Sequence, residues 1–167
     1  MKLPLLFLFV GFFLLLIQTT FLHVLPLGPI VPDLILVLCV YWGLNYPTVS
    51  AVLGCFIFGY SVDVFSSPIL GINAFAMSLV FLAVYLGSRH IWVPNPLLSA
   101  LVVFFASWIK GAVLIIIWTF FLAVDGMSIR VLRYLFLEAL FSAILAPALF
   151  YLLRRSQSSL ERIPISL

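Results

Sequence analysis

The sequence predicts an all-α integral membrane protein, folded as a compact bundle of six transmembrane helices. Of its 167 residues, 66% are hydrophobic and only 8% are charged, against about 25% charged in an ordinary soluble domain. Apolar runs follow one another along most of the chain, and proline, glycine and charged residues separate them. The polar stretches between these runs are too short to fold separately. One helical bundle therefore accounts for the whole chain.

The basic charge balance predicts membrane topology rather than nucleic-acid binding. The net charge is +3, but the eight Lys and Arg residues are scattered and no soluble face collects them. Cys39 and Cys55 lie inside apolar runs without a CxxC spacing, so the sequence predicts neither a disulfide nor a metal site. We expect no cofactor and no nucleic-acid partner.

The first helix is expected to remain as a membrane anchor. It follows Lys2 and resembles a signal peptide, but its end lacks a small-x-small cleavage site. We expect residues 1–153 to form the six-helix transmembrane domain and residues 154–167 a short basic cytoplasmic tail. The expected helices cover residues 4–23, 32–46, 48–65, 68–88, 97–123 and 133–153.

The second helix is the doubtful one, because its strictly apolar part, residues 34–42, is too short to cross about 30 Å of hydrocarbon. Either it spans together with its flanks or it is re-entrant. The positive-inside tendency favours six spans with both termini cytoplasmic. That topology leaves Arg130 and Arg133 outside and five cationic residues inside: Lys2, Arg89, Arg154, Arg155 and Arg162.

Asp63 needs compensation, because it lies near the outer C-terminal end of the third helix, where the helix dipole disfavours a negative charge. If Ser67 caps the fourth helix and Pro68 occupies its first turn, Asp63 and Asn73 lie about equally far from the turn. We therefore expect a hydrogen bond between them. A structural hinge and a contact for a partner protein are both compatible with it.

Three further charged residues lie in or near the predicted spans. Asp33 follows Pro32 at a helix start, where both residue types are favourable. Lys110 lies roughly 20 Å into the fifth helix and needs a carboxylate, water or a snorkelling route. Glu138 is the intramembrane acid on that side, but only about 8 Å below the outer surface. A snorkelling Lys110 and a buried Lys110–Glu138 pair are both open, and the role of this charge is not predicted.

The sequence favours no catalytic function. It contains neither HExxH nor GxSxG, and no two carboxylates are placed for acid–base work on one surface. A small lipid-modifying enzyme therefore lacks candidate catalytic residues.

The landmarks from the second to the fourth expected helix resemble the MreD family of bacterial rod shape-determining membrane proteins, whereas the other three helices match only in hydropathy. These landmarks are Pro32-Asp33, Tyr41-Trp42-Gly43, Gly59 with Asp63, Ser66-Ser67-Pro68, and Leu70-Gly71-Ile72-Asn73-Ala74. The stretch from Gly54 to Ala74 is the specific part, although Val64 follows the aspartate where the family more often has Leu. The resemblance implies a partner-binding or structural role for the following residues: Pro32, Asp33, Trp42, Gly43, Gly59, Asp63, Pro68, Gly71 and Asn73.

The resemblance implies a non-enzymatic scaffold of the elongation machinery (elongasome), in the bacterial cytoplasmic membrane. Such a scaffold binds MreC directly and helps to organise lateral peptidoglycan synthesis and rod cell shape. RodA, a class B penicillin-binding protein and MreB belong to the same assembly, and membrane lipid surrounds it. The family's fold is also similar to the substrate-binding subunits of energy-coupling-factor transporters.

That fold similarity supplies an alternative function, a small-molecule (vitamin) binding subunit of a transporter. Such a subunit needs a cavity with convergent polar groups and small-xxx-small packing on its first helix. Here the first helix contains Gly11 but no Ala. A scaffold needs only a rigid bundle with a place for another helix, which Gly54 and Gly59 beside Gly71 and Ala74 would allow. The sequence therefore favours the scaffold.

Overall fold

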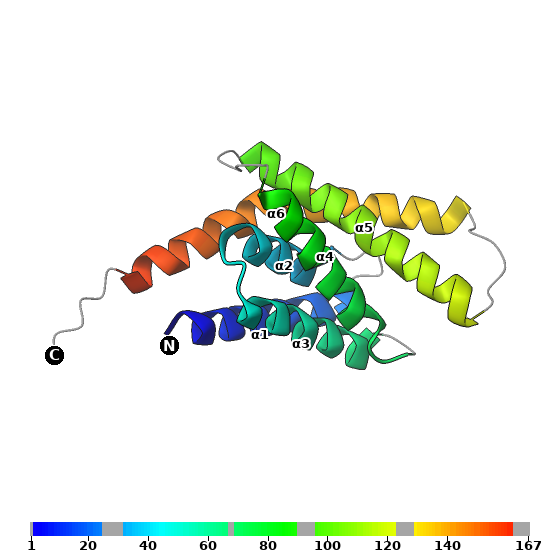
Figure 1. Ribbon diagram of the computed structural model, residues 1–167, viewed down its shortest axis with the longest axis horizontal. Helices are drawn as coiled ribbons and strands as arrows, with labels where there is room; N and C mark the ends of the chain where they lie inside the picture. The colour runs from blue at the N-terminus through cyan, green and yellow to red at the C-terminus, as the bar shows by residue number, and fades with distance from the viewer. Residues whose placement is uncertain (1, 25–31, 67–68, 90–95, 123–128, 162–167) are drawn as a thin grey trace.

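The computed structural model describes residues 2–24, 32–66, 69–89, 96–122 and 129–161, and these are helical apart from short caps and turns. The helices are α1 Lys2–Val24, α2 Leu34–Asn45, α3 Val49–Ser66, α4 Ile72–Ser88, α5 Pro96–Leu122 and α6 Ile129–Glu161. Figure 1 shows α5 and α6 side by side, with α1 and α3 on the opposite side of α2.

Three segments of the described chain are long and apolar enough to cross a membrane: Val49–Ser66, Leu97–Phe120 and Val131–Ser156. Shorter apolar helical segments are Leu8–Thr20, Leu34–Asn45 and Ile72–Ser88. The all-α class is therefore confirmed for the described residues, and three of their segments could cross a membrane, whereas the count of six spans stays a prediction.

Four helices begin and end within two residues of the expected bounds, and α4 and α6 do not. Helix α4 begins at Ile72 with Gly71 as its N-cap, so the expected start at Pro68 and the expected cap at Ser67 are wrong. Ser67 and Pro68 themselves lie outside the described residues. The predicted hydrogen bond between Asp63 and Asn73 was derived from a helix start that is four residues too early.

Helix α6 is longer than expected at both ends and continues through Arg154 and Arg155 to Glu161. Charged residues end the apolar run there but not the helix, because Arg, Leu, Gln and Glu are good helix formers. The first half of the expected tail is thus helical. The division of the chain at residue 153 stays a prediction.

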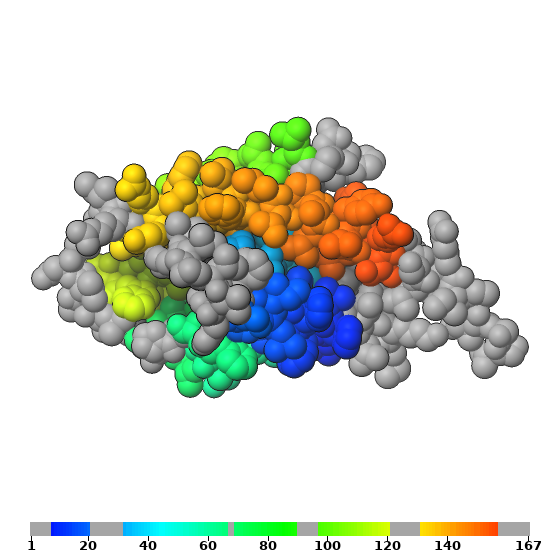
Figure 2. All heavy atoms as spheres, turned by 180° about the vertical axis from the view of Figure 1, so that it is seen from behind, coloured from blue at the N-terminus to red at the C-terminus, as the bar shows by residue number. Residues whose placement is uncertain are grey.

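Helix α2 lies at the centre of the bundle. All residues from 34 to 43 are buried, and the helix contacts α1, α3, α4, α5 and α6. Seen from behind, little of α2 is visible between α1 and α6 (Figure 2). A helix that is apolar on every side belongs inside a protein. Its 12 residues extend about 18 Å, so both of its ends need partners close to the core.

Glycines allow the helices around α2 to approach closely. A Cβ on Gly59 would lie 2.7 Å from the Ala74 Cα, and one on Gly43 would lie 3.0 Å from a Val84 methyl group. Trp42 covers Gly54 in the same way, at 2.7 Å. Small residues at contacts between membrane helices permit this packing. Gly54 and Gly59 therefore make room for this chain's own α2 and α4.

Candidate functional site

The carboxylate of Asp63 joins the end of α3 to the start of α4. The side chain is fully buried. Its Oδ2 accepts hydrogen bonds from the backbone N–H groups of Gly71 at 3.0 Å and Ala74 at 3.2 Å. The backbone N–H of Asn73 donates to both carboxylate oxygens, at 3.1 Å to Oδ1 and 3.0 Å to Oδ2. The Asn73 side-chain amide donates to Oδ1 at 2.9 Å. We call Asp63 with these donors the Asp63 cap.

The Asp63 cap satisfies a helix start that has no capping side chain of its own. The first N–H groups of a helix lack intrahelical partners, and the N-cap of α4 is a glycine. The positive end of the α4 dipole stabilises the carboxylate, and this offsets the unfavourable position of Asp63 at the end of α3. The predicted bond between Asp63 and Asn73 is present. The backbone bonds were missed, because they depend on where α4 begins.

Gly71 is required for its backbone conformation and not for space. Its φ is +95°, in the left-handed region, and a Cβ built there would meet no atom within 4 Å. Bulk at Gly71 therefore does not press α3 and α4 apart. A substitution there strains the turn, and its side chain points into open space.

A second set of polar residues holds the buried N-terminus of α2. The Asp33 backbone N–H donates to Ser142 Oγ of α6 at 2.9 Å, and the Ile35 N–H donates to Gln18 Oε1 of α1 at 3.3 Å. The Asp33 carboxylate accepts from the Leu36 N–H at 3.0 Å, as an N-cap does. Two neighbouring helices and the N-cap residue of α2 thus supply partners for groups that lipid cannot satisfy.

Lys110 of α5 pairs with Asp33 inside the protein. Its ammonium group contacts Asp33 Oδ2, and Glu138 Oε1 of α6 lies 3.8 Å away. The side chains of Asp33 and Lys110 are 3% and 10% exposed, whereas that of Glu138 is 29% exposed. Among the open alternatives, the structure therefore has a buried Lys110 and not a snorkelling one. Glu138 is the more exposed of the two carboxylates near Lys110, and its contact with the ammonium group is the longer one.

Sequence reasoning assigned Asp33 only to a helix start, and it does cap α2. Its ion pair with Lys110 was missed, because no local pattern links positions that are 77 residues apart. Gln18 and Ser142 were missed as well. The available signal was that each is a polar side chain within an apolar run.

Two other expected residues have packing roles. The Trp42 ring lies 6.0 Å from the Phe58 ring, and Gly43 allows α2 to approach α4. Pro32 is half-buried, and its carbonyl accepts from the Leu34 N–H at 3.1 Å. Pro68 lies outside the described residues.

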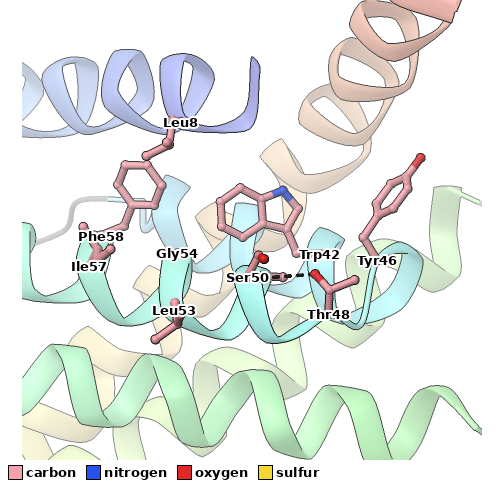
Figure 3. A pocket seen from close by; sticks show the side chains of 10 residues that line it. Leu8, Trp42, Tyr46, Thr48, Ser50, Leu53, Gly54, Ile57 and Phe58 are labelled. Atoms are coloured by element: carbon pink, nitrogen blue, oxygen red, sulfur yellow. Dashed lines mark hydrogen bonds between the residues drawn. The ribbon is translucent and has the colours of Figure 1, made fainter. Parts of the chain in front are cut away.

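Trp42 also borders a pocket of about 410 Å³ between α1, α2 and α3. Figure 3 shows Leu8, Ile57 and Phe58 at one end of the pocket, with Tyr46 and Thr48 at the other. Its lining is mostly apolar. Within the described part of the chain, no three His, Cys, Asp or Glu residues come together to hold a metal ion. The geometry of this pocket suits an apolar group and offers no catalytic arrangement.

Substitutions at the Asp63 cap should have unequal effects. We expect Asp63→Ala to lower the free energy of unfolding by about 2–3 kcal/mol, because it removes the acceptor of several N–H groups at once. Asn73→Ala should lower it by only about 1 kcal/mol, because the backbone donors remain. The double variant should match Asp63→Ala alone. Thermal unfolding in detergent measures these values.

The control for the Asp63 cap is Ser61→Ala. The Ser61 hydroxyl bonds within its own helix, to the Ile57 carbonyl at 2.9 Å, so its loss should change stability little. Additive losses in the Asp63 and Asn73 variants would contradict the shared hydrogen-bond group.

Removing one partner of the buried ion pair should be worse than removing both. Lys110→Met leaves Asp33 without its cation and should destabilise the protein by about 3–5 kcal/mol. Adding Asp33→Asn should recover part of that loss, because no charge is then stranded and one amide oxygen can still cap α2. Glu138→Gln should cost less than about 1 kcal/mol, since its contact is long and partly exposed. Equal losses for Lys110→Met and Glu138→Gln would contradict this order.

Comparison with known proteins gives one match. The family model described as rod shape-determining protein MreD matches residues 1–156. No curated protein and no solved structure matches the chain, so the expected similarity to energy-coupling-factor transporter subunits stays a prediction. The match covers nearly all of the chain, including the Asp63 cap and the Asp33–Lys110 pair. The chain therefore belongs to the MreD family of rod shape-determining proteins.

Proposed function

We propose that this protein is a non-enzymatic membrane scaffold of the elongasome that binds MreC and helps to organise lateral peptidoglycan synthesis. RodA, a class B penicillin-binding protein and MreB belong to the same assembly under this proposal. The observation that carries it is the family match over residues 1–156, which implies a role in determining rod shape.

The internal polar contacts support a scaffold. Asp63 is used to cap α4, and Asp33, Lys110, Gln18 and Ser142 are used to hold α2. Burying these groups in satisfied pairs fixes the relative positions of the helices. A bundle held in this way presents a constant outer surface to its partners.

The end of the α3–α4 hairpin is the surface that we propose for MreC. Val64 and Phe65 at the end of α3 and Leu70 before α4 are all more than half exposed. Leu70 directly precedes Gly71, where an added Cβ would meet none of the described residues within 4 Å. Large exposed apolar side chains beside a rigid turn are suited to contact with another apolar surface.

For the topology, we propose six spans in the bacterial cytoplasmic (inner) membrane, with both termini in the cytoplasm. The asymmetry of Lys and Arg supports this orientation. Under it, α2 crosses only part of the bilayer as a helix, inside a ring formed by its neighbours.

The transporter alternative has less support. It requires convergent polar groups in a cavity, whereas the pocket in Figure 3 is lined mainly by apolar side chains. The first N–H groups of α2 and α4 are instead bonded to Gln18 of α1 and to Asp63 of α3.

A reporter test checks the orientation. An alkaline phosphatase fusion after Arg155 should be inactive and one within residues 125–128 active, because the enzyme folds only outside the cytoplasm. A green fluorescent protein at the same two sites should give the opposite pattern. An active phosphatase after Arg155 would overturn the proposed topology.

A variant at Gly71 tests MreC binding. Gly71→Asn adds a side chain in the open space, and Asn tolerates the left-handed backbone better than other residues. We expect this variant to accumulate in the membrane, to co-purify with several-fold less MreC, and to produce rounded cells.

The matched control is Gly87→Asn at the other end of α4. A Cβ there also meets nothing within 4 Å. It should leave cell shape and MreC binding unchanged. Normal shape and normal MreC binding in Gly71→Asn cells would remove the hairpin as the docking site, and equal losses for both variants would point to general damage.

A further inference from the structure

A groove runs along the outside of α3 and α4. Its volume is about 440 Å³. The side chains of Val49 and Val52 line it from the first turn of α3, and those of Phe75, Leu79, Leu82 and Tyr85 line it from α4. Several of these side chains are exposed, so the groove opens to the surroundings of the bundle. It is separate from the Asp63 cap, the Asp33–Lys110 pair and the pocket of Figure 3.

The length of the groove matches one leaflet of a bilayer. From Phe75 to Tyr85 the helix advances ten residues, or about 15 Å. This is half of the roughly 30 Å hydrocarbon core. A single acyl chain can therefore lie along α4 over about half of the thickness of the hydrocarbon core.

Arg89 places a positive charge at the Tyr85 end of the groove. Its guanidinium Nη2 donates to the Tyr85 hydroxyl at 3.0 Å, and its Cζ lies 5.4 Å from the centre of the Tyr85 ring. Arg89 is exposed. Arg89 takes no part in the ion pairs that Lys110 makes with Asp33 and Glu138. The guanidinium is thus held in place with N–H donors available for an anion.

We propose that this groove binds an anionic phospholipid, with one acyl chain along α4 and the phosphate group at Arg89. Charge complementarity selects this occupant. An apolar helix of a partner would fill the groove but leave the arginine unpaired, whereas a lipid phosphate accepts hydrogen bonds from guanidinium. A lipid with a net negative charge gains more than a zwitterionic one, because no ammonium group competes with Arg89.

This lipid site goes beyond the scaffold function and does not depend on MreC binding. Under the proposed topology, Arg89 lies on the cytoplasmic side, where anionic lipids attract basic residues.

Native mass spectrometry of the purified full-length protein tests the site, with palmitoyl-oleoyl phosphatidylglycerol and the matching phosphatidylcholine as probes. We expect the phosphatidylglycerol to bind about fivefold more tightly. Arg89→Gln should abolish this preference. The matched control is Arg154→Gln, which removes an exposed arginine that does not line the groove and should keep the preference.

A second pair of variants tests the acyl-chain part. Leu82→Trp fills the groove at a side chain that is 49% exposed and should weaken binding of both lipids several-fold. Leu86→Trp changes a similarly exposed residue of α4 outside the groove lining and should weaken neither. Circular dichroism checks that each variant is folded. If Leu82→Trp unfolds, the comparison of Arg89→Gln with Arg154→Gln still tests the proposal.

Three results would overturn the proposal. The first is equal binding of the two lipids by the unchanged protein. The second is an equal loss of phosphatidylglycerol binding in Arg89→Gln and Arg154→Gln, which would indicate a non-specific electrostatic attraction to basic residues. The third is unchanged binding by a folded Leu82→Trp variant. Failure of MreC binding in the Gly71 test would leave these outcomes unaffected.

Discussion

A helix that begins inside a membrane protein must find partners for its first backbone N–H groups within the protein, because lipid offers none. Helix α2 is such a helix, apolar on every side and enclosed by its neighbours. Gln18 of α1, Ser142 of α6 and the N-cap residue Asp33 provide for the start of α2. The arrangement of α1, α2 and α6 follows from this constraint, and Lys110 adds α5 to it.

The two buried aspartates solve the same problem with different counter-charges. Asp63 accepts hydrogen bonds from backbone N–H groups and one side-chain amide at the start of α4, so aligned dipoles stabilise its charge. Asp33 accepts one N–H in the first turn of α2 and in addition contacts the Lys110 ammonium group. The first arrangement is local to a hairpin, whereas the second joins positions that are distant in the chain. Loss of Asp63 should therefore loosen one hairpin, and loss of Lys110 should loosen the centre of the bundle.

These contacts join the helices through polar groups in the interior of the protein, whereas its exterior is mainly apolar. The interior groups are engaged in holding helices together, which is consistent with a structural role in rod shape determination. The exterior carries the two features for which we propose other molecules as partners. They are the exposed end of the α3–α4 hairpin and the groove that leads to Arg89.

The sequence by itself determined the class, most helix positions and the family. Long apolar runs have few alternatives in a bilayer, and four helices end close to where proline, glycine and polar residues predicted. The bond between Asp63 and Asn73 was also predictable, since a short turn places neighbouring helix ends together. The landmarks between Gly54 and Ala74 pointed to the family that matches residues 1–156.

Only the tertiary structure decided which polar groups meet across the bundle. The pair of Asp33 and Lys110, and the roles of Gln18 and Ser142, depend on how α1, α5 and α6 pack around α2. Hydropathy gives the length of each helix but not its rotation about its own axis. That rotation is set by close contacts such as Gly59 against Ala74 and Gly43 against Val84. The start of α4 was misplaced for a related reason, because its cap comes from the preceding helix and not from the residues of the turn.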